Sequence, residues 1–308
     1  MLMRLYAMLF PGQEKQKKNV LLSLIKKYKI IKQTFDESSE YVGHNLYKLV
    51  DNSSQQEMDK SKYTKLITLT ISVAMYRLWQ QKNRNIPVIL SGHSLGEYSA
   101  LVCAESLKFC DAIKLIILRD KFMKESMKHK LGAMNVIIGL KQFKIEKILK
   151  KFNIIKEVSI ACINTYNQIV ISGEKCAVYK VSSACQKIGA KKIFRLSINP
   201  PSHCMLMIEA SKKLSTILKH ISFKIPIFPI VNNVDVKCET SAHAIRSALT
   251  RQLYNPVRWS EIITYLSNKY VSMFIELGLN NTLTNLNKST IAIPSISPNN
   301  TVNFYQRF

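Results

Sequence analysis

Length, composition and charge limit what this chain can be. With 308 residues, 47% of them hydrophobic, it can bury a large core and is not a disordered chain. The net charge of +25 comes from lysines spread in short clusters, without interleaved aromatic residues or a nucleic-acid-binding motif. We therefore expect no nucleic-acid partner. The charge either follows from a composition rich in Lys, Ile and Asn or attracts an acidic carrier protein or phosphates.

The sequence also argues against a membrane protein or a metalloprotein. No apolar run approaches the roughly 20 residues that a membrane-spanning helix needs, and the first ten residues lack the features of a signal peptide. The seven cysteines are scattered, with no spacing typical of a zinc site or a disulfide framework. We expect free thiols and a cytoplasmic location, with no membrane partner and no metal.

Apolar strand patterns alternate with helical patterns over the first third of the chain. Residues 1–10 are expected to form a buried first strand and residues 87–90 a second strand. Residues 62–81 and 97–107 have helical periodicity. This alternation predicts a largely parallel sheet covered by helices.

The pattern changes after residue 132. Strand, helix, strand, strand, helix and strand patterns follow at residues 133–140, 143–152, 158–163, 168–172, 177–188 and 191–196. This order is typical of a ferredoxin-like unit. We therefore predict an α/β fold, in which an α/β-hydrolase-like subdomain of residues 1–127 and 199–308 carries a ferredoxin-like insertion of residues 128–198.

A Gly-x-Ser-x-Gly motif at residues 92–96 lies between a short apolar strand and a helix. This is the context of a nucleophile elbow, in which a serine stands in a strained turn and the glycines let neighbouring backbone pass. Ser94 is therefore the candidate nucleophile, and the Leu95 N–H is placed to stabilise an oxyanion. Neighbouring side chains diverge at a sharp turn, so His93 is expected to support the elbow.

A serine hydroxyl needs a base, usually a histidine. Four of the six histidines lie in polar or lysine-rich surroundings and are expected at the surface: His44, His129, His220 and His243. His203 follows two prolines that stiffen its approach, and it is either the base or a capping or packing histidine. No aspartate lies at an obvious strand end between Ser94 and His203, but a backbone carbonyl can orient an imidazole.

Arg119 ends an otherwise apolar helical run over residues 112–118. It is either a surface arginine whose stem lies along apolar neighbours or a fixed guanidinium that binds a substrate carboxylate through two hydrogen bonds. Lysine performs the second task less well.

Further motifs accompany these residues in a fixed order. They are Phe10-Pro11-Gly12-Gln13, Gly132-Ala133-Met134, Asn164 with Gln168, Pro201-Ser202-His203-Cys204, Asn232-Asn233-Val234-Asp235 and Arg251-Gln252-Leu253-Tyr254-Asn255-Pro256. Over roughly Leu5 to Lys288 the chain resembles the malonyl-CoA:acyl carrier protein transacylases of bacterial type II fatty acid synthesis. The ferredoxin-like insertion is also a feature of that family.

The resemblance implies ping-pong acyl transfer. Ser94 would take the malonyl group from coenzyme A as an ester, and the phosphopantetheine thiol of an acidic acyl carrier protein would then accept it. His203 would act as general base and acid, with the backbone carbonyl of Gln252 orienting its ring. The substrates are malonyl-CoA and the acyl carrier protein, with no further cofactor, and we expect a monomer.

The resemblance also assigns the remaining groups of the site. Arg119 would bind the malonyl carboxylate, and the N–H groups of Gln13 and Leu95 would form the oxyanion hole. His93 and Asn164 would support this arrangement.

Some positions depart from the family pattern. Glu14 and Lys15 replace a glycine and a serine beside the oxyanion hole, and residues 278–281 replace a turn rich in glycine and proline. Because Glu14 can disturb the hole or repel anionic substrates, we expect lower activity than is typical of the family. Two alternatives remain: a serine esterase or thioesterase that uses the same elbow, and a catalytically weakened module that binds acyl carrier protein.

Overall fold

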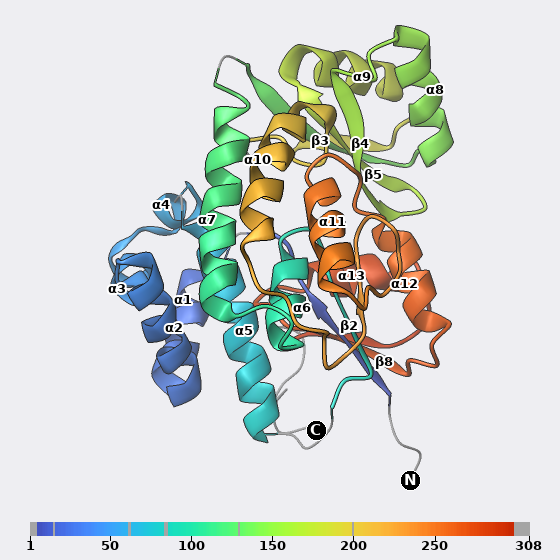
Figure 1. Ribbon diagram of the computed structural model, residues 1–308. Helices are drawn as coiled ribbons and strands as arrows, with labels where there is room; N and C mark the ends of the chain where they lie inside the picture. The colour runs from blue at the N-terminus through green and yellow to red at the C-terminus, as the bar shows by residue number, and fades with distance from the viewer. Residues whose placement is uncertain are drawn as a thin grey trace.

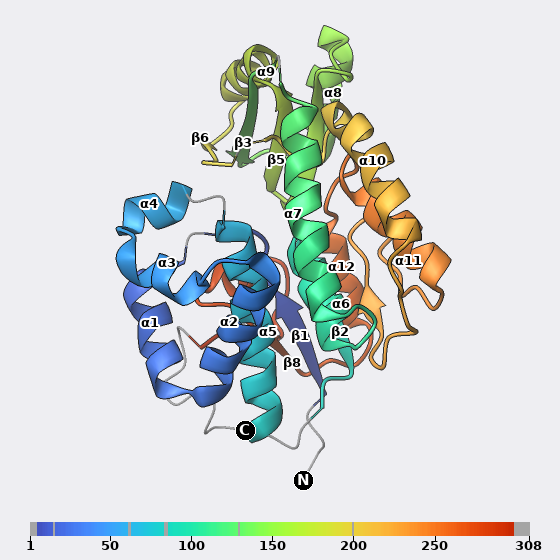
Figure 2. The same cartoon turned by 60° about the vertical axis from the view of Figure 1, so that its left-hand side comes forward.

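Two sheets organise the protein (Figure 1). The computed structural model describes residues 5–14, 16–60, 63–82, 86–128, 130–198 and 200–298. The larger sheet lies inside the main body, and the smaller sheet forms a second body beside it, reached by the long helix α7 (Figure 2).

The larger sheet is entirely parallel. Its strands are β1 (Tyr6–Phe10), β2 (Ile89–Gly92), β7 (Ile230–Val231), β8 (Met273–Glu276) and β9 (Ser295–Ile296), in the order β7-β2-β1-β8-β9. Parallel strands covered on both faces are expected to be apolar throughout, and every residue of β1 is buried. The predicted parallel sheet is therefore confirmed.

Helices cover both faces of this sheet. They are α1 (Lys18–Lys27), α2 (Lys29–Val42), α3 (Leu46–Asn52), α4 (Gln55–Lys60), α5 (Thr64–Lys82), α6 (Gly96–Cys103), α7 (Phe109–Glu125), α10 (Ile208–Lys219), α11 (Ala242–Gln252), α12 (Trp259–Ser267) and α13 (Thr282–Lys288). A short 3-10 helix, η1 (Met205–Met207), precedes α10. Met8 and Phe10 of β1 join the core formed with α1, α2, α5, α6, α7 and α10, whereas Ala7 and Leu9 join the core formed with α12 and α13. No helix among these described segments is long and apolar enough to cross a bilayer.

The smaller sheet is antiparallel. Its elements are β3 (Gly132–Ile138), α8 (Gln142–Phe152), β4 (Val158–Thr165), β5 (Gln168–Glu174), α9 (Lys175–Lys187) and β6 (Lys192–Arg195). The strand order β4-β5-β3-β6 with a helix after the first and third strands is the ferredoxin-like arrangement, so this part of the predicted fold is confirmed. The boundaries at 127/128 and 198/199 stay a prediction.

The two sheets are joined along the inner face of the smaller one. Met134 and Val136 of β3 belong to the same core as Leu9 of the large sheet. The Ile163 N–H donates to the Val257 carbonyl and the Val257 N–H to the Ala161 carbonyl, each at 2.9 Å. Strand β4 is thus fixed to the segment between α11 and α12, and a cavity lies between the two subdomains.

Candidate active site

The elbow at residues 92–96 has the predicted strand-turn-helix arrangement. Ser94 stands between β2 and α6 with a φ of 52°, a left-handed conformation that costs energy in a non-glycine residue. A Cβ at Gly92 would lie 1.9 Å from the carbonyl carbon of Gly96, and one at Gly96 would lie 2.0 Å from the Phe10 carbonyl oxygen. The turn therefore requires glycine at both positions.

Ser94 and His203 form a dyad across the elbow. Ser94 Oγ lies 2.7 Å from His203 Nε2, and His203 Nδ1 lies 2.7 Å from the Gln252 carbonyl oxygen and 3.2 Å from that of Asn255. Since a carbonyl can only accept, the proton sits on Nδ1, and Nε2 is free to accept the proton of Ser94. The structure thus brings Ser94, His203 and Gln252 together as the sequence suggested, and carbonyl oxygens occupy the place of the missing aspartate.

His203 is a buried, neutral imidazole. Its ring is buried, with 2% of the residue exposed. Burial lowers the pKa of His203 to about 3, and the positive charge of Arg119 is the next largest cause of this shift. The hydrogen bonds from Nδ1 to the two carbonyls act in the opposite direction and raise the pKa. The imidazole is therefore neutral at physiological pH.

A buried polar network that the sequence analysis did not identify fixes the elbow. Asn233 Oδ1 accepts a hydrogen bond from the Ser94 N–H, and Asn233 Nδ2 donates to the Gly92 carbonyl, both at 2.6 Å. The Glu97 carboxylate accepts from the Asn233 N–H at 3.0 Å and from Gln252 Nε2 at 2.8 Å. Burial raises the pKa of Glu97 to about 7. Asn233 and Gln252 stand in motifs noted above and Glu97 directly follows the Gly-x-Ser-x-Gly motif, but no sequence spacing shows that the three residues meet.

The dyad opens into a cavity of about 470 Å³ between the subdomains. Gln13 and Leu95 line this cavity together with Ser94, and Leu95 directly follows Ser94 in the chain. Within the described residues, neither backbone N–H has an acceptor in the protein. These two N–H groups are therefore candidate donors to a group bound in the cavity.

Arg119 is a buried cation that forms no ion pair with any of the residues that the structure describes. It lies inside α7, which continues to Glu125, so its predicted place at the helix end is wrong, and the residue is 3% exposed rather than at the surface. Its Nε and Nη2 have no hydrogen-bond partner, and it forms no ion pair within the described residues. Lys65, which lines the same cavity, is paired with Asp120. A buried, uncompensated guanidinium is costly, so Arg119 offers a site for an anionic ligand.

His93 connects the elbow to the smaller subdomain. Its Nε2 lies 2.9 Å from the Oδ1 of Asn164, on β4, and its ring contacts the Trp259 ring at 5.4 Å between centroids. The two residues expected to support the site thus contact each other. Three of the four histidines expected at the surface are exposed, namely His44, His220 and His243. The fourth, His129, lies outside the described residues.

Glu14 is turned toward the segment that follows β8. Its Oε2 accepts a hydrogen bond from Thr282 Oγ1 at 2.8 Å, and Asn280 also donates to it. Burial, and next the negative charge of Glu276, raise the pKa of Glu14 to about 7. The two departures from the family pattern, at residues 14 and 278–281, therefore contact each other. Lys15 lies outside the described residues.

No group of three or more His, Cys, Asp or Glu side chains that could hold a metal occurs in the described part of the chain. Ser94, His203 and Arg119 are among the polar residues that line the cavity. The acyl transferase domain matches residues 7–307. The chain belongs to the acyl transferase domain family.

Relatives of this acyl transferase carry a more specific name. Two proteins named malonyl CoA-acyl carrier protein transacylase are similar to it over most of their length. The one from Buchnera aphidicola subsp. Baizongia pistaciae is 48% identical over 97% of this chain and 96% of its own. The one from Escherichia coli K12 is 43% identical over 93% of each chain.

A solved structure is similar as well. It is a malonyl-transacylase in complex with a type II polyketide acyl-carrier protein, 43% identical, with a TM-score of 0.92 over 96% of each chain. These relatives are transacylases, and they do not support the esterase or thioesterase alternative.

Proposed function

We propose that this acyl transferase moves the malonyl group of malonyl-CoA to the phosphopantetheine thiol of acyl carrier protein, through an ester on Ser94. The observation that carries the proposal is the placement of the Ser94–His203 dyad and the unpaired Arg119 around one cavity. A nucleophile and a cation at that site suit an acyl group that ends in a carboxylate.

In the first half-reaction, His203 Nε2 takes the proton of Ser94 as Oγ attacks the thioester carbonyl. The N–H groups of Gln13 and Leu95 stabilise the tetrahedral oxyanion, and each such donor contributes about 3 kcal/mol in comparable sites. The C–S bond then breaks, and His203 returns the proton to the coenzyme A thiolate. The products are malonyl-Ser94 and free coenzyme A.

The second half-reaction runs the same steps in reverse order. The phosphopantetheine thiol enters the cavity, His203 takes its proton, and the thiolate attacks the ester carbonyl. Ser94 leaves with the proton from His203. Transfer outcompetes hydrolysis only if water is kept from the ester, and apolar side chains from both subdomains line the cavity around Ser94.

Arg119 selects the acyl group in this scheme. A malonyl carboxylate satisfies the guanidinium with two hydrogen bonds, whereas an acetyl group leaves it buried and unpaired. An unpaired buried charge costs roughly 2–5 kcal/mol, which favours malonyl over acetyl transfer.

The remaining expectations are part of the same proposal. The net charge of +25 supports an acidic acyl carrier protein as partner, and a related transacylase has been solved with an acyl-carrier protein. The enzyme would act in the cytoplasm as a monomer, without a cofactor besides its substrates. Residues 128–198 would form a subdomain inserted into the catalytic one of residues 1–127 and 199–308.

Intact-protein mass spectrometry after incubation with malonyl-CoA tests the covalent step. We expect one malonyl adduct on the wild type and none on Ser94→Ala. Ser202→Ala is the matched control, because Ser202 lines the same cavity and its side chain forms no hydrogen bond with Ser94 or His203 within the described residues, and the variant should keep the adduct. An unmodified wild type, or an adduct on Ser94→Ala, would refute the mechanism. Addition of acyl carrier protein should move the malonyl group to its thiol; release of free malonate alone would indicate a hydrolase.

A further inference from the structure

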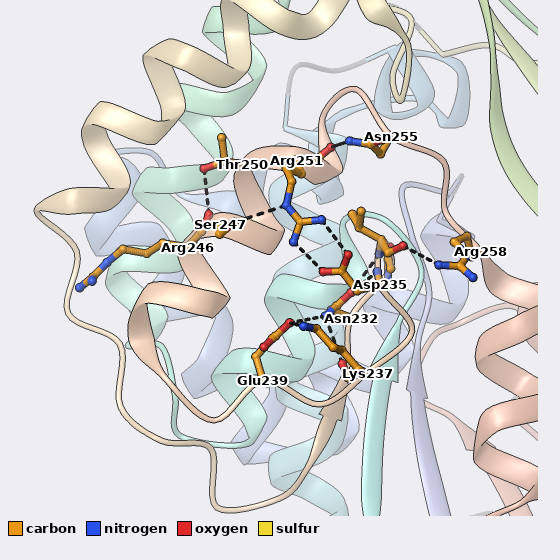
Figure 3. Close-up of polar contacts among 12 residues, drawn as sticks. Asn232, Asp235, Lys237, Glu239, Arg246, Ser247, Thr250, Arg251, Asn255 and Arg258 are labelled. Carbon is orange, nitrogen blue, oxygen red and sulfur yellow. Dashed lines mark hydrogen bonds and ion pairs between the residues drawn. The ribbon is translucent and has the colours of Figure 1, made fainter.

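Outside the cavity, an ion pair joins Asp235, in the loop after β7, to Arg251, in the last turn of α11 (Figure 3). Arg251 Nη1 and Nη2 donate to Asp235 Oδ1 and Oδ2 at 2.7 and 2.6 Å, in a bidentate arrangement that fixes direction as well as distance. Neither residue lines the cavity, so neither is placed to contact the substrate.

Asp235 is connected to Ser94 through the loop after β7. The Asp235 N–H donates to Asn232 Oδ1 at 2.7 Å, which holds the loop after β7 in a tight turn (Figure 3). Asn233, which directly follows Asn232 in that loop, accepts a hydrogen bond from the Ser94 N–H and donates one to the Gly92 carbonyl. The position of Asp235 is therefore coupled to the elbow through one short turn.

Arg251 is connected to His203 through the end of α11 and the residues that follow it. Arg251 lies in the last turn of α11, directly before Gln252, whose carbonyl accepts from His203 Nδ1. The Arg251 carbonyl accepts from Asn255 Nδ2 at 2.9 Å, and the Asn255 carbonyl is the second acceptor for His203 Nδ1 (Figure 3). Both carbonyls that orient the imidazole thus belong to the segment that Arg251 anchors.

We propose that the Asp235–Arg251 pair is a positioning element, which keeps the Ser94 loop and the His203-orienting segment in one fixed arrangement. The inference rests on the proposed function, because it concerns the same dyad. The pair acts on the chemical step through His203 and not on substrate binding, since Arg119 lies on a different element, α7.

A purely structural role predicts different behaviour. The two side chains are 33% and 25% exposed, so water screens their attraction, and even a bidentate pair of this exposure is expected to contribute only modestly to folding stability. Loss of the pair should therefore leave the melting temperature nearly unchanged while the rate of acyl transfer falls. The Arg77–Glu37 pair between α5 and α2, 30% and 33% exposed, offers a matched control, since neither residue lines the cavity or contacts the segments that hold Ser94 and His203 among the described residues.

The test measures the single-turnover rate of Ser94 malonylation at saturating malonyl-CoA, together with the dissociation constant of malonyl-CoA. Asp235→Asn and Arg251→Gln should each slow malonylation about 10-fold, less than the roughly 100-fold that a 1 Å displacement of a catalytic group costs. The dissociation constant should change by less than about 2-fold, because only the chemical step is affected. Transfer to acyl carrier protein should slow by the same factor, since His203 serves both half-reactions.

Further variants separate a positioning role from general damage. The double variant should be no slower than either single variant, because the two residues act as one unit. Arg251→Lys, which keeps the charge but not the paired hydrogen bonds, should recover part of the rate, and the control variant Glu37→Gln should match the wild type.

Several outcomes would overturn the inference. They are wild-type rates in both single variants, multiplied losses in the double variant, and a weakened malonyl-CoA affinity with a lowered melting temperature. A wild-type protein that forms no malonyl ester would instead refute the proposed function, and the positioning role with it.

Discussion

The carboxyl group of Glu14 should make the protein less stable as the pH rises, and Glu14→Gln should remove that effect. Glutamine keeps the shape of the side chain and an oxygen to accept from Thr282, but it cannot ionise. In the folded protein the pKa of Glu14 is raised to about 7 by burial and by the charge of Glu276. In the unfolded chain the carboxyl ionises near its ordinary value of 4.5.

The sign and size of the effect follow from proton binding. Between pH 4.5 and 7 the folded state holds a proton that the unfolded state has lost, so the free energy of unfolding falls as the pH rises through this range. The full loss persists above pH 7. Each pKa unit corresponds to about 1.4 kcal/mol, and partial exposure to water reduces the total, so we expect about 1–3 kcal/mol.

Urea denaturation of the wild type and Glu14→Gln at pH 5 and pH 8 measures this difference. The variant should be close to the wild type at pH 5 and more stable at pH 8. Glu57→Gln is a control whose effect on stability has the opposite sign. Hydrogen bonds from Ser54 lower the pKa of that exposed carboxyl, so its charge stabilises the folded protein above pH 4.5 and the variant should be less stable than the wild type at both pH values. An equal stability difference for Glu14→Gln at both pH values would refute the reasoning.

Other predictions concern the site itself. Arg119→Ala should lose the malonyl preference: the ratio of kcat/KM for malonyl-CoA to that for acetyl-CoA should fall by a factor that corresponds to roughly 2–5 kcal/mol. An unchanged ratio would show that Arg119 does not determine the specificity for malonyl. Gly96→Ala should lower the free energy of unfolding by about 3 kcal/mol or more, since its Cβ would meet the Phe10 carbonyl oxygen at 2.0 Å. Wild-type stability in denaturation would contradict the close approach. Because the pKa of His203 is lowered to about 3, kcat/KM should not fall on acidification until well below pH 6.5, and a decline centred near 6.5 would contradict a neutral, buried base.

The parts of the site that the sequence could predict are those encoded locally. Ser94 is surrounded by a five-residue motif that forms one turn, and the alternation of strand and helix patterns gave the order of the ferredoxin-like unit. His203 stood out because two prolines precede it. These inferences need no knowledge of which distant segments meet.

The parts that the sequence could not predict depend on contacts across the fold. Asn233 reaches Ser94 over 139 positions, and Gln252 reaches Glu97 over 155, so no periodicity signals either contact. Arg119 was placed at a helix end because the apolar run stops there, whereas α7 continues through polar residues to Glu125. The direction of the Glu14 side chain also depends on a distant contact, because its partner Thr282 lies 268 positions away in the chain.

The unpaired charge of Arg119 links substrate recognition to the strength of the base. After burial, that charge is the main cause of the low pKa of His203. A bound malonyl carboxylate would neutralise the guanidinium and so raise the pKa of the imidazole, making it a stronger proton acceptor when the correct acyl group is in place. The acid limb of kcat, which reports the bound enzyme, should then lie at higher pH than that of kcat/KM. Acetyl-CoA would bind without strengthening the base, so discrimination would extend from binding into the chemical step.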